Sequence, residues 1–248
     1  MTLTEFFEIH NKAAIAFSGG VDSAYLAYAA KKSGADICAY YVNSAFQPAF
    51  ELKDAENFAE MFDIGFKILN IDILGCDKII SNSSDRCYYC KHLIFESIMA
   101  EARKDGYNIL IDGTNASDVD SERPGMKAGK ELGIISPLKE CGLTKTDIRR
   151  LSSEAGLFTA VKPSYSCLAT RIKTDELITA EKLKNIEKAE NFLFRLGFSD
   201  FRVRFSDGTA KLQFAASEYE KALKDKENII REMEIYFPTV LSEFEVRT

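Results

Sequence analysis

Short apolar runs alternate with stretches of helical periodicity through the first half of the chain. Each run has the length of a buried strand, and the stretches between them repeat apolar residues at spacings of three and four. The apolar runs are Lys12–Phe17, Asp36–Val42, Phe66–Ile71 and Tyr107–Ile111. The helical stretches are Asp22–Lys32, Ala49–Phe62 and His92–Lys104. Strands alternating with helices of this length predict an α/β fold with a mostly parallel sheet and helices on both faces.

Two further elements are predicted before the pattern changes. Ile134–Leu138 is a candidate fifth strand, and a helix is expected to begin near Thr144. Thr144 and Asp147 have the spacing of a capping box, in which each residue's side chain bonds the other's backbone N–H. These elements complete an expected α/β domain over residues 1–165.

After Pro163 the pattern becomes that of a small α+β unit. A long helix is predicted at Thr179–Leu196, followed by a hairpin, a second helix and a last strand. The hairpin pairs Phe201–Phe205 with Ala210–Phe214, the second helix spans Ser217–Tyr236, and the strand is Leu241–Val246. We therefore expect a second domain over residues 166–248, for substrate binding or oligomerisation.

Composition narrows the class of protein. The 248 residues are 46% hydrophobic and 28% charged, as in ordinary globular chains. No apolar run approaches the ~20 residues that cross a bilayer, and the first residues lack the basic-then-apolar pattern of a secretory signal. We expect a cytoplasmic protein with no membrane partner. The net charge of −6 argues against an extended nucleic-acid surface.

The six cysteines are the most informative part of the composition. In a chain without an export signal they favour free thiols, metal ligands or catalysts over disulfides. The chain has only two histidines, which argues against a His-based metal site or a Ser-His-Asp triad. The chemistry is expected to use thiols, carboxylates, lysines, arginines or a cofactor.

A glycine-containing loop follows the first predicted strand and opens the first predicted helix. It consists of Ser18, Gly19, Gly20, Val21, Asp22 and Ser23. Adjacent glycines let the backbone approach an anion closely, and the N–H groups at the helix start can hold it. No lysine follows as in a Walker A loop, and the GxGxxG spacing of dinucleotide folds is absent. The alternative is an ordinary glycine turn, but its place after a strand favours phosphate binding.

Two segments place thiols beside cations. Cys87 and Cys90 have CxxC spacing just before a predicted helix, and Cys167 lies in a turn-rich segment ending at Arg171. Nearby cations stabilise thiolates. One interpretation is a zinc site with His92 as a further ligand. The other is an iron–sulfur cluster with one open iron, which three cysteines without an obvious fourth suit better.

The remaining cysteines carry weaker expectations. Cys38 lies inside a predicted strand and is expected to be a core residue. Cys76 and Cys141 lie near glycines in predicted loops and receive no role.

The SGGVDS loop resembles the signature of PP-loop ATP pyrophosphatases, which split ATP into AMP and pyrophosphate. Taken with other segments, the chain resembles the LarE family, ATP-dependent sulfur transferases of nickel-pincer nucleotide biosynthesis, over nearly its whole length. These segments are Tyr41–Phe46, Arg86–Lys91, Ile111–Gly113, Arg123–Lys127, Lys162–Arg171, Leu196–Phe198 and Phe201–Phe205.

The resemblance implies a reaction and its cofactors. ATP adenylates a carboxylate of pyridinium-3,5-biscarboxylic acid mononucleotide, and sulfur then replaces AMP to give a thiocarboxylate. One class of the family sacrifices the sulfur of the cysteine matching Cys167. Another holds a [4Fe-4S] cluster that carries an extra sulfide. With Cys87, Cys90 and Cys167 present, this chain matches the cluster class.

Further roles are implied by the same resemblance. Asn43 and Ser44 would lie near the adenosine, and Asp22 and Asp118 are candidate Mg²⁺ ligands, with Asp22 and Cys167 the catalytic candidates. The candidate substrate-binding residues are Arg171, Glu190, Arg202 and Arg204. Without the resemblance, the last two arginines would be solvated charges on a hairpin and Glu190 an exposed helical residue. The family also implies a homo-oligomer, while the sequence identifies no sulfur donor.

Two other functions fit parts of the pattern. A PP-loop tRNA thiolase also uses three cysteines but activates a nucleobase, and the net charge and lack of an added RNA-binding module count against it. A non-catalytic module would bind ATP and structural zinc without releasing AMP.

Overall fold

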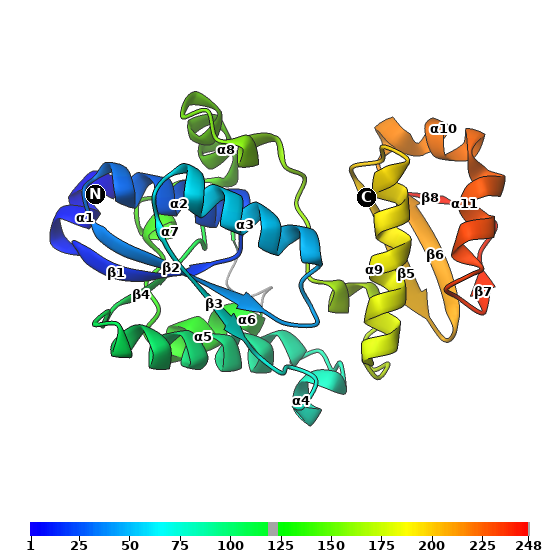
Figure 1. Cartoon of the computed structure of the whole chain (residues 1–248), viewed down its shortest axis with the longest axis horizontal. Coiled ribbons are helices and arrows are strands. Elements are labelled where there is room, and N and C mark those ends of the chain that lie inside the picture. The colour runs from blue at the N-terminus through cyan, green and yellow to red at the C-terminus, as the bar shows by residue number, and fades with distance from the viewer. Residues whose placement is uncertain (119–123, 248) are drawn as a thin grey trace. The chain divides into compact units, whose positions relative to one another are not determined.

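The computed structural model describes residues 1–118 and 124–247. Two compact units make up this chain (Figure 1): Met1–Asp72 with Asp85–Ser164, and Ile73–Ser84 with Tyr165–Thr248. Arg123, one residue of the family-like segments, lies outside the described residues.

The N-terminal unit is built on a parallel sheet. Its strands are β1 (Lys12–Phe17), β2 (Asp36–Asn43), β3 (Gly65–Asn70) and β4 (Leu110–Asp112), in the order β3-β2-β1-β4. All three neighbouring pairs are parallel. The four strands predicted from the apolar runs are confirmed, with small shifts at their ends.

The fifth strand predicted at Ile134–Leu138 is wrong. Only Ile135 bridges to the sheet, opposite Ile111. Pro137 begins the helix α7 (Pro137–Glu140), where a residue without an N–H is well tolerated in the first turn. The apolar run is therefore divided between a single bridge and a helix start.

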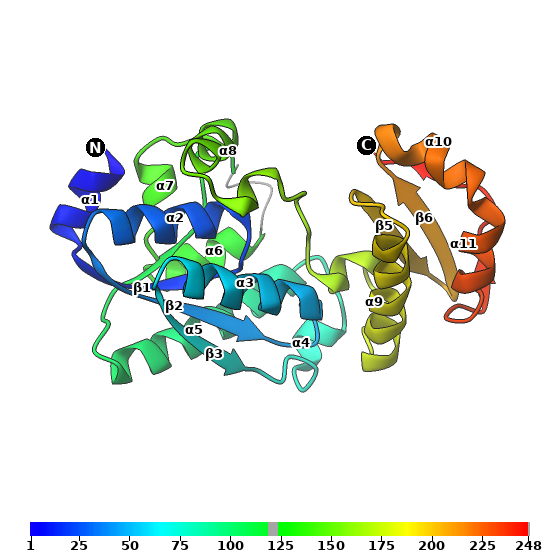
Figure 2. The same ribbon diagram turned by 45° about the horizontal axis from the view of Figure 1, so that its top comes forward.

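Helices cover both faces of this sheet (Figures 1 and 2). One face packs against α1 (Leu3–Ile9), α2 (Val21–Lys32), α3 (Ala49–Met61), α7 and α8 (Lys145–Glu154). The other packs against α5 (Arg86–Lys104), and α6 (Pro124–Glu131) lies along α5. A 3₁₀ turn, η2 (Phe158–Val161), follows α8. The predicted α/β fold is confirmed, and so is the capping box of Thr144 and Asp147.

The C-terminal unit contains a second, smaller sheet. Its strands are β5 (Phe201–Ser206), β6 (Thr209–Phe214), β7 (Thr239–Val240) and β8 (Glu245–Val246). The hairpin of β5 and β6 is antiparallel as predicted, and β7 and β8 each run parallel to β6. The single last strand predicted at Leu241–Val246 is therefore wrong.

The helices of this unit are α4 (Asp77–Ile80), η3 (Leu168–Arg171), α9 (Ala180–Arg195), α10 (Ala216–Lys224) and α11 (Lys226–Met233). The long helix predicted at Thr179–Leu196 is confirmed by α9. The helix predicted at Ser217–Tyr236 is two helices, because the backbone at Asp225 leaves helical geometry (φ −104°, ψ 16°).

Asn82 shows why Ile73–Ser84 belongs with the C-terminal unit. Its side-chain amide is buried and donates to the Lys173 backbone carbonyl at 2.7 Å. The backbone carbonyl of Asn82 accepts from Asp175 N–H at 2.9 Å. Ile178 N–H donates to the Ile80 carbonyl at 2.8 Å. These bonds attach the segment to residues some ninety positions further along the chain.

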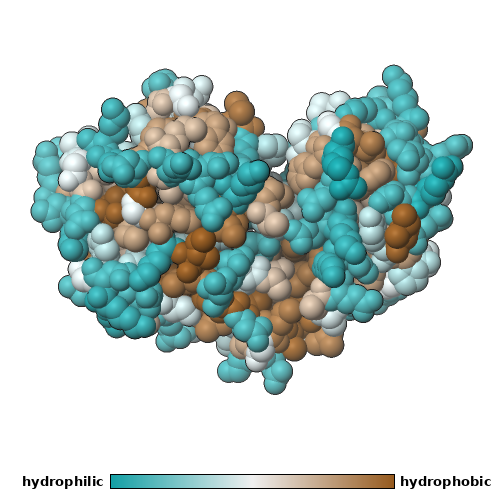
Figure 3. Space-filling view, viewed as in Figure 1, coloured by the Kyte–Doolittle hydropathy of each residue, from teal (hydrophilic) through white to brown (hydrophobic). Residues whose placement is uncertain are grey.

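Hydrophilic side chains are spread over the visible face of both units, broken by smaller apolar areas (Figure 3). Across the described residues, we find no helix with the length and apolar character needed to span a bilayer.

Candidate functional site

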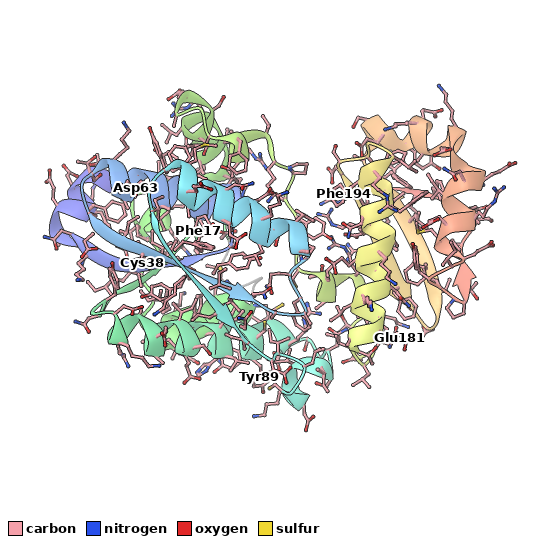
Figure 4. All side chains as sticks on the ribbon, in the orientation of Figure 1. Phe17, Cys38, Asp63, Tyr89, Glu181 and Phe194 are labelled. Atoms are coloured by element: carbon pink, nitrogen blue, oxygen red, sulfur yellow. The ribbon has the colours of Figure 1, made fainter. Side chains whose placement is uncertain are left out.

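The SGGVDS loop joins the end of β1, marked by Phe17 in Figure 4, to the start of α2. Gly19 has φ +73°, a conformation that favours glycine. Gly20 occupies the N-cap of α2 and has no side chain to bond the first turn. The helix start therefore offers backbone N–H groups and the positive end of its dipole to an anion.

Two serines hold this loop in shape. Ser23 Oγ donates to the Gly20 carbonyl at 3.1 Å and accepts from Ser18 N–H at 3.3 Å. The Ser18 and Ser23 hydroxyl oxygens are 3.1 Å apart. Since Ser23 is buried, its hydroxyl fixes the turn, while Ser18 is exposed.

The loop lies where the strand order of the sheet reverses. β2 and β3 extend the sheet on one side of β1, and β4 pairs on the other. In open α/β sheets, ligands bind outside the carboxyl ends of the strands at this switch point. Gly113, just after β4, comes so close that an added Cβ would be 2.8 Å from Ser23 N. The chain after β4 is thus one wall of the phosphate loop.

Gly113→Ala is expected to lower the free energy of unfolding by about 1–3 kcal/mol, because the methyl group meets backbone that cannot rotate away. Thermal unfolding followed by circular dichroism measures this. Gly129→Ala in α6 is the matched control, since its Cβ would make an ordinary 3.5 Å contact with Phe95. Equal melting temperatures for the two variants would show that Gly113 is not a close-packed wall.

The candidate magnesium ligands have different surroundings. Asp22 Oδ2 is 2.5 Å from Lys145 Nζ, whereas Oδ1 is buried with no hydrogen-bond partner among the described residues. Asp118 accepts from Asn115 N–H at 3.0 Å, a bond that shapes the loop after β4. The unpartnered oxygen makes Asp22 the residue better suited to a metal ion.

Asn43 and Ser44 lie at the carboxyl end of β2. Asn43 Nδ2 donates to Asn70 Oδ1 at 2.8 Å, at the end of the neighbouring β3, and Ser44 Oγ donates to Gln47 Oε1 at 2.5 Å. Both residues are half-buried at the ligand-binding edge of the sheet. This position is compatible with the adenosine role expected of them.

The CxxC cysteines lie inside a helix, which corrects the expectation that they precede it. Cys87 and Cys90 fall in the first turns of α5, near Tyr89 in Figure 4. Residues three apart share a helix face. Arg86 Nη2 is 3.6 Å from Cys87 Sγ.

Pro124–Lys127, the described part of the RPG-containing segment, packs on this turn. An added Cβ at Gly125 would be 3.0 Å from Lys91 Cγ and 3.4 Å from the Cys87 carbonyl. The start of α6 thus packs against RCYYCK at the start of α5, and both segments belong to the family-like pattern.

Cys167 belongs to the C-terminal unit, at the N-cap of η3. Its carbonyl accepts from Thr170 N–H at 3.0 Å and Thr170 Oγ1 at 2.8 Å. All six cysteines are free thiols. Over residues 1–118 and 124–247, no three His, Cys, Asp or Glu side chains are arranged to hold a metal ion.

The other three cysteines lie elsewhere in the fold. Cys38 lies in β2 and packs against the core beneath α5, as predicted, and burial raises the pKa of its thiol. Burial also raises the pKa of Cys141, directly after α7. Cys76 precedes α4.

Glu190 is buried at the centre of an arginine cluster, so its interpretation as an exposed helical residue is wrong. The carboxylate is 1% exposed and receives Arg171 Nε at 2.7 Å and Nη2 at 3.2 Å. It also accepts from Val203 N–H at 3.0 Å. Although burial lowers the pKa of Arg171, the charge and hydrogen bonds of Glu190 outweigh it and raise that pKa.

Arg202 and Arg204 project from one face of β5 and are not solvated hairpin charges. Arg202 is 3% exposed and donates to its neighbour's carbonyl, that of Phe201, at 2.6 Å. Burial and the charge of Arg171 lower the pKa of Arg202 to about 10 and also lower that of Arg204. Three guanidinium groups thus gather around one buried carboxylate, and an anion would relieve their repulsion.

Tyr165 is a member of the cluster that sequence analysis gave no role. Its hydroxyl donates to Glu190, and its ring lies beneath the guanidinium groups of Arg171 and Arg202, 4.7 and 5.4 Å from the ring centre. The only signal in the sequence was an aromatic residue two positions before Cys167.

Comparisons with known proteins find relatives that are similar over most of this chain. Residues 12–85 match the family model described as Queuosine biosynthesis protein QueC. An uncharacterized protein of Synechocystis sp. is 34% identical over 90% of this chain and 84% of its own length. Another from Methanocaldococcus jannaschii is 31% identical over 92% of this chain and 86% of its own. The pyridinium-3,5-bisthiocarboxylic acid mononucleotide synthase of Lactiplantibacillus plantarum is 29% identical over 94% of this chain and 85% of its own.

The chain belongs to the LarE-like family. It is therefore an ATP-dependent sulfur transferase with a PP-loop fold, as the sequence resemblance implied. The LarE-like chain combines the phosphate loop of the N-terminal unit with Cys167 and the arginine cluster of the C-terminal unit.

Proposed function

We propose that this LarE-like chain transfers sulfur to a carboxylate of pyridinium-3,5-biscarboxylic acid mononucleotide. The observation that carries the proposal is the connection between the arginine cluster and the turn of Cys167. Arg171 Nη1 donates to the Ser166 carbonyl at 3.2 Å, and Arg204 Nη1 donates to the Thr170 carbonyl at 2.6 Å. Cations suited to a substrate phosphate are thus tied to the residues on either side of Cys167.

The first step uses the N-terminal unit. The substrate carboxylate attacks the α-phosphorus of ATP, and pyrophosphate leaves on the N–H groups of the SGGVDS loop. Asp22 and Asp118 would bind the accompanying Mg²⁺, which neutralises charge on the leaving group. Asn43 and Ser44 would contact the adenosine. The product is an acyl adenylate with a good leaving group.

The second step exchanges oxygen for sulfur. A sulfur nucleophile attacks the acyl carbon, and AMP leaves with one of the original carboxylate oxygens, giving a thiocarboxylate. Two rounds convert both carboxylates of the substrate. Arg171, Arg202 and Arg204, oriented by Glu190, hold the mononucleotide phosphate during both rounds.

The thiols have the chemistry of an iron–sulfur site. Cys87 and Cys90 share one helix face of the N-terminal unit, and Cys167 belongs to the C-terminal unit. These three thiols would be the ligands of a [4Fe-4S] cluster with one open iron. When bound, the cluster supplies a sulfide as the transferable sulfur. Cys87, Cys90 and Cys167 would hold it, with Arg86 beside Cys87. An external donor must replace the sulfide after each transfer. Separately, we expect the chain to assemble as a homo-oligomer.

Protein purified without oxygen is expected to release AMP from ATP only with the pyridinium mononucleotide present. Chromatography of AMP after a single turnover measures this. Unmodified tRNA serves as the comparison substrate. AMP release with tRNA and not with the mononucleotide would support the thiolase instead, and ATP binding without AMP release from either would indicate a non-catalytic module.

The same preparation is expected to contain about four irons per chain with acid-labile sulfide. Both are lost in Cys87→Ala, because three thiolates are needed to hold the cluster. Elemental analysis measures iron and zinc, and Cys38→Ala is the control because Cys38 belongs to the core. Stoichiometric zinc, or no metal in the wild type, would overturn the cluster and leave sacrifice of Cys167 as the sulfur source.

A further inference from the structure

Lys145 lies at the phosphate loop without a part in the proposed chemistry. Its ammonium is 2.5 Å from Asp22 Oδ2, and the two side chains are 33% and 23% exposed. Ion pairs with this access to water contribute little to stability. Because Lys145 lies against Asp22, the second residue of α2, its position indicates a role in binding the ligand of the phosphate loop.

The backbone at Lys145 is held firmly. Lys145 is the first residue of α8, and its N–H donates to Ser117 Oγ at 3.0 Å. Ser117 N–H in turn donates to Oδ1 of the buried Asn115 at 2.8 Å, and Ala116 N–H donates to the Leu143 carbonyl at 2.8 Å. The start of α8 is thus tied to the chain that leaves β4, on the wall formed by Gly113.

The two carboxylate oxygens of Asp22 differ in their surroundings. Lys145 neutralises Oδ2, whereas Oδ1 is buried without a hydrogen-bond partner among the described residues. Magnesium prefers carboxylate oxygens, and an ammonium forms strong bonds to phosphate oxygens. A magnesium–phosphate ligand would satisfy both side chains better than they satisfy each other.

We propose that Lys145 is a phosphate-binding residue whose ammonium is paired with Asp22 until the phosphate ligand binds. Without nucleotide, the ammonium neutralises Asp22; with magnesium and ATP bound, it transfers to the phosphate oxygens while Asp22 takes the metal ion. No covalent bond changes in this exchange. The inference rests on the proposed use of Mg²⁺ and ATP and adds a residue to that site.

The exchange predicts opposite effects of two variants on pyrophosphate binding, measured by calorimetry in EDTA. Lys145→Met is expected to weaken the affinity about tenfold, the loss of one charge-assisted contact. Asp22→Asn is expected to strengthen it, because the ammonium loses its competing carboxylate. With Mg²⁺ added, the wild type gains affinity and Asp22→Asn does not. Lys145→Arg keeps most of the affinity.

Lys31→Met is the matched control, since Lys31 pairs with Asp63 at 3.0 Å near the other end of α2. It is expected to leave the affinity unchanged. If Lys145→Met binds pyrophosphate like the wild type, or if Asp22→Asn weakens binding in EDTA, the exchange is wrong. In that case continued AMP formation by the wild type would still support the proposed function, whereas no binding of ATP by any variant would overturn both.

Discussion

Replacing Glu190 with alanine is expected to lower the free energy of unfolding by about 3–5 kcal/mol, because it removes one partner of a buried ion pair. The guanidinium of Arg171 would remain at 1% exposure with no counter-charge, beside the buried Arg202. Val203 N–H would also lose its acceptor.

Urea unfolding followed by far-ultraviolet circular dichroism measures this effect, since the chain has no tryptophan. Glu181→Ala on the same helix is the control (Figure 4). As an exposed residue of the first turn, it is expected to cost less than about 1 kcal/mol. A Glu190→Ala variant as stable as Glu181→Ala would show that the cluster does not depend on its carboxylate.

Replacing Cys167 with alanine is expected to abolish thiocarboxylate formation, a fall of at least about 10³-fold. Adenylation should continue, because the phosphate loop and Asp22 belong to the N-terminal unit, whereas Cys167 belongs to the C-terminal unit. Mass spectrometry of the nucleotide product and chromatography of AMP separate the two steps.

Cys141→Ala is the matched control, since Cys141 lies after α7 and its thiol pKa is raised by burial. Cys87→Ala distinguishes the two sulfur sources. The cluster account expects it to fail as Cys167→Ala does, whereas sacrifice of Cys167 would leave it active for one turnover. Thiocarboxylate formation by Cys167→Ala at the wild-type rate would remove Cys167 from the reaction.

The sheet of the N-terminal unit could be predicted because each strand is a continuous apolar run. Lys12–Phe17 was expected and observed with the same bounds, since burial on both faces leaves an unambiguous pattern. The break at Asp225 could not be foreseen, because lysine, aspartate and glutamate around it give no stop signal. The start of α5 was placed too late because RCYYCK shows no helical periodicity of apolar residues.

The contacts of the site residues were harder to predict from the sequence than the motifs that contain them. Glu190 is buried by bonds from Arg171, nineteen positions earlier, and Val203, thirteen positions later. Neither contact follows from local pattern. The same holds for Gly113 and Lys145, whose roles come from the packing of β4 and α8 against the first turn of α2. Motifs indicated which segments matter, and tertiary contacts showed how their side chains are held.

Mass spectrometry of a single anaerobic turnover tests the central claim most directly. The protein would be mixed with ATP, Mg²⁺ and pyridinium-3,5-biscarboxylic acid mononucleotide, and both the nucleotide and the intact chain would be weighed. The account predicts a thiocarboxylated mononucleotide together with AMP, and a chain of unchanged mass. A folded, cluster-loaded protein that binds ATP yet forms no thiocarboxylate would contradict it.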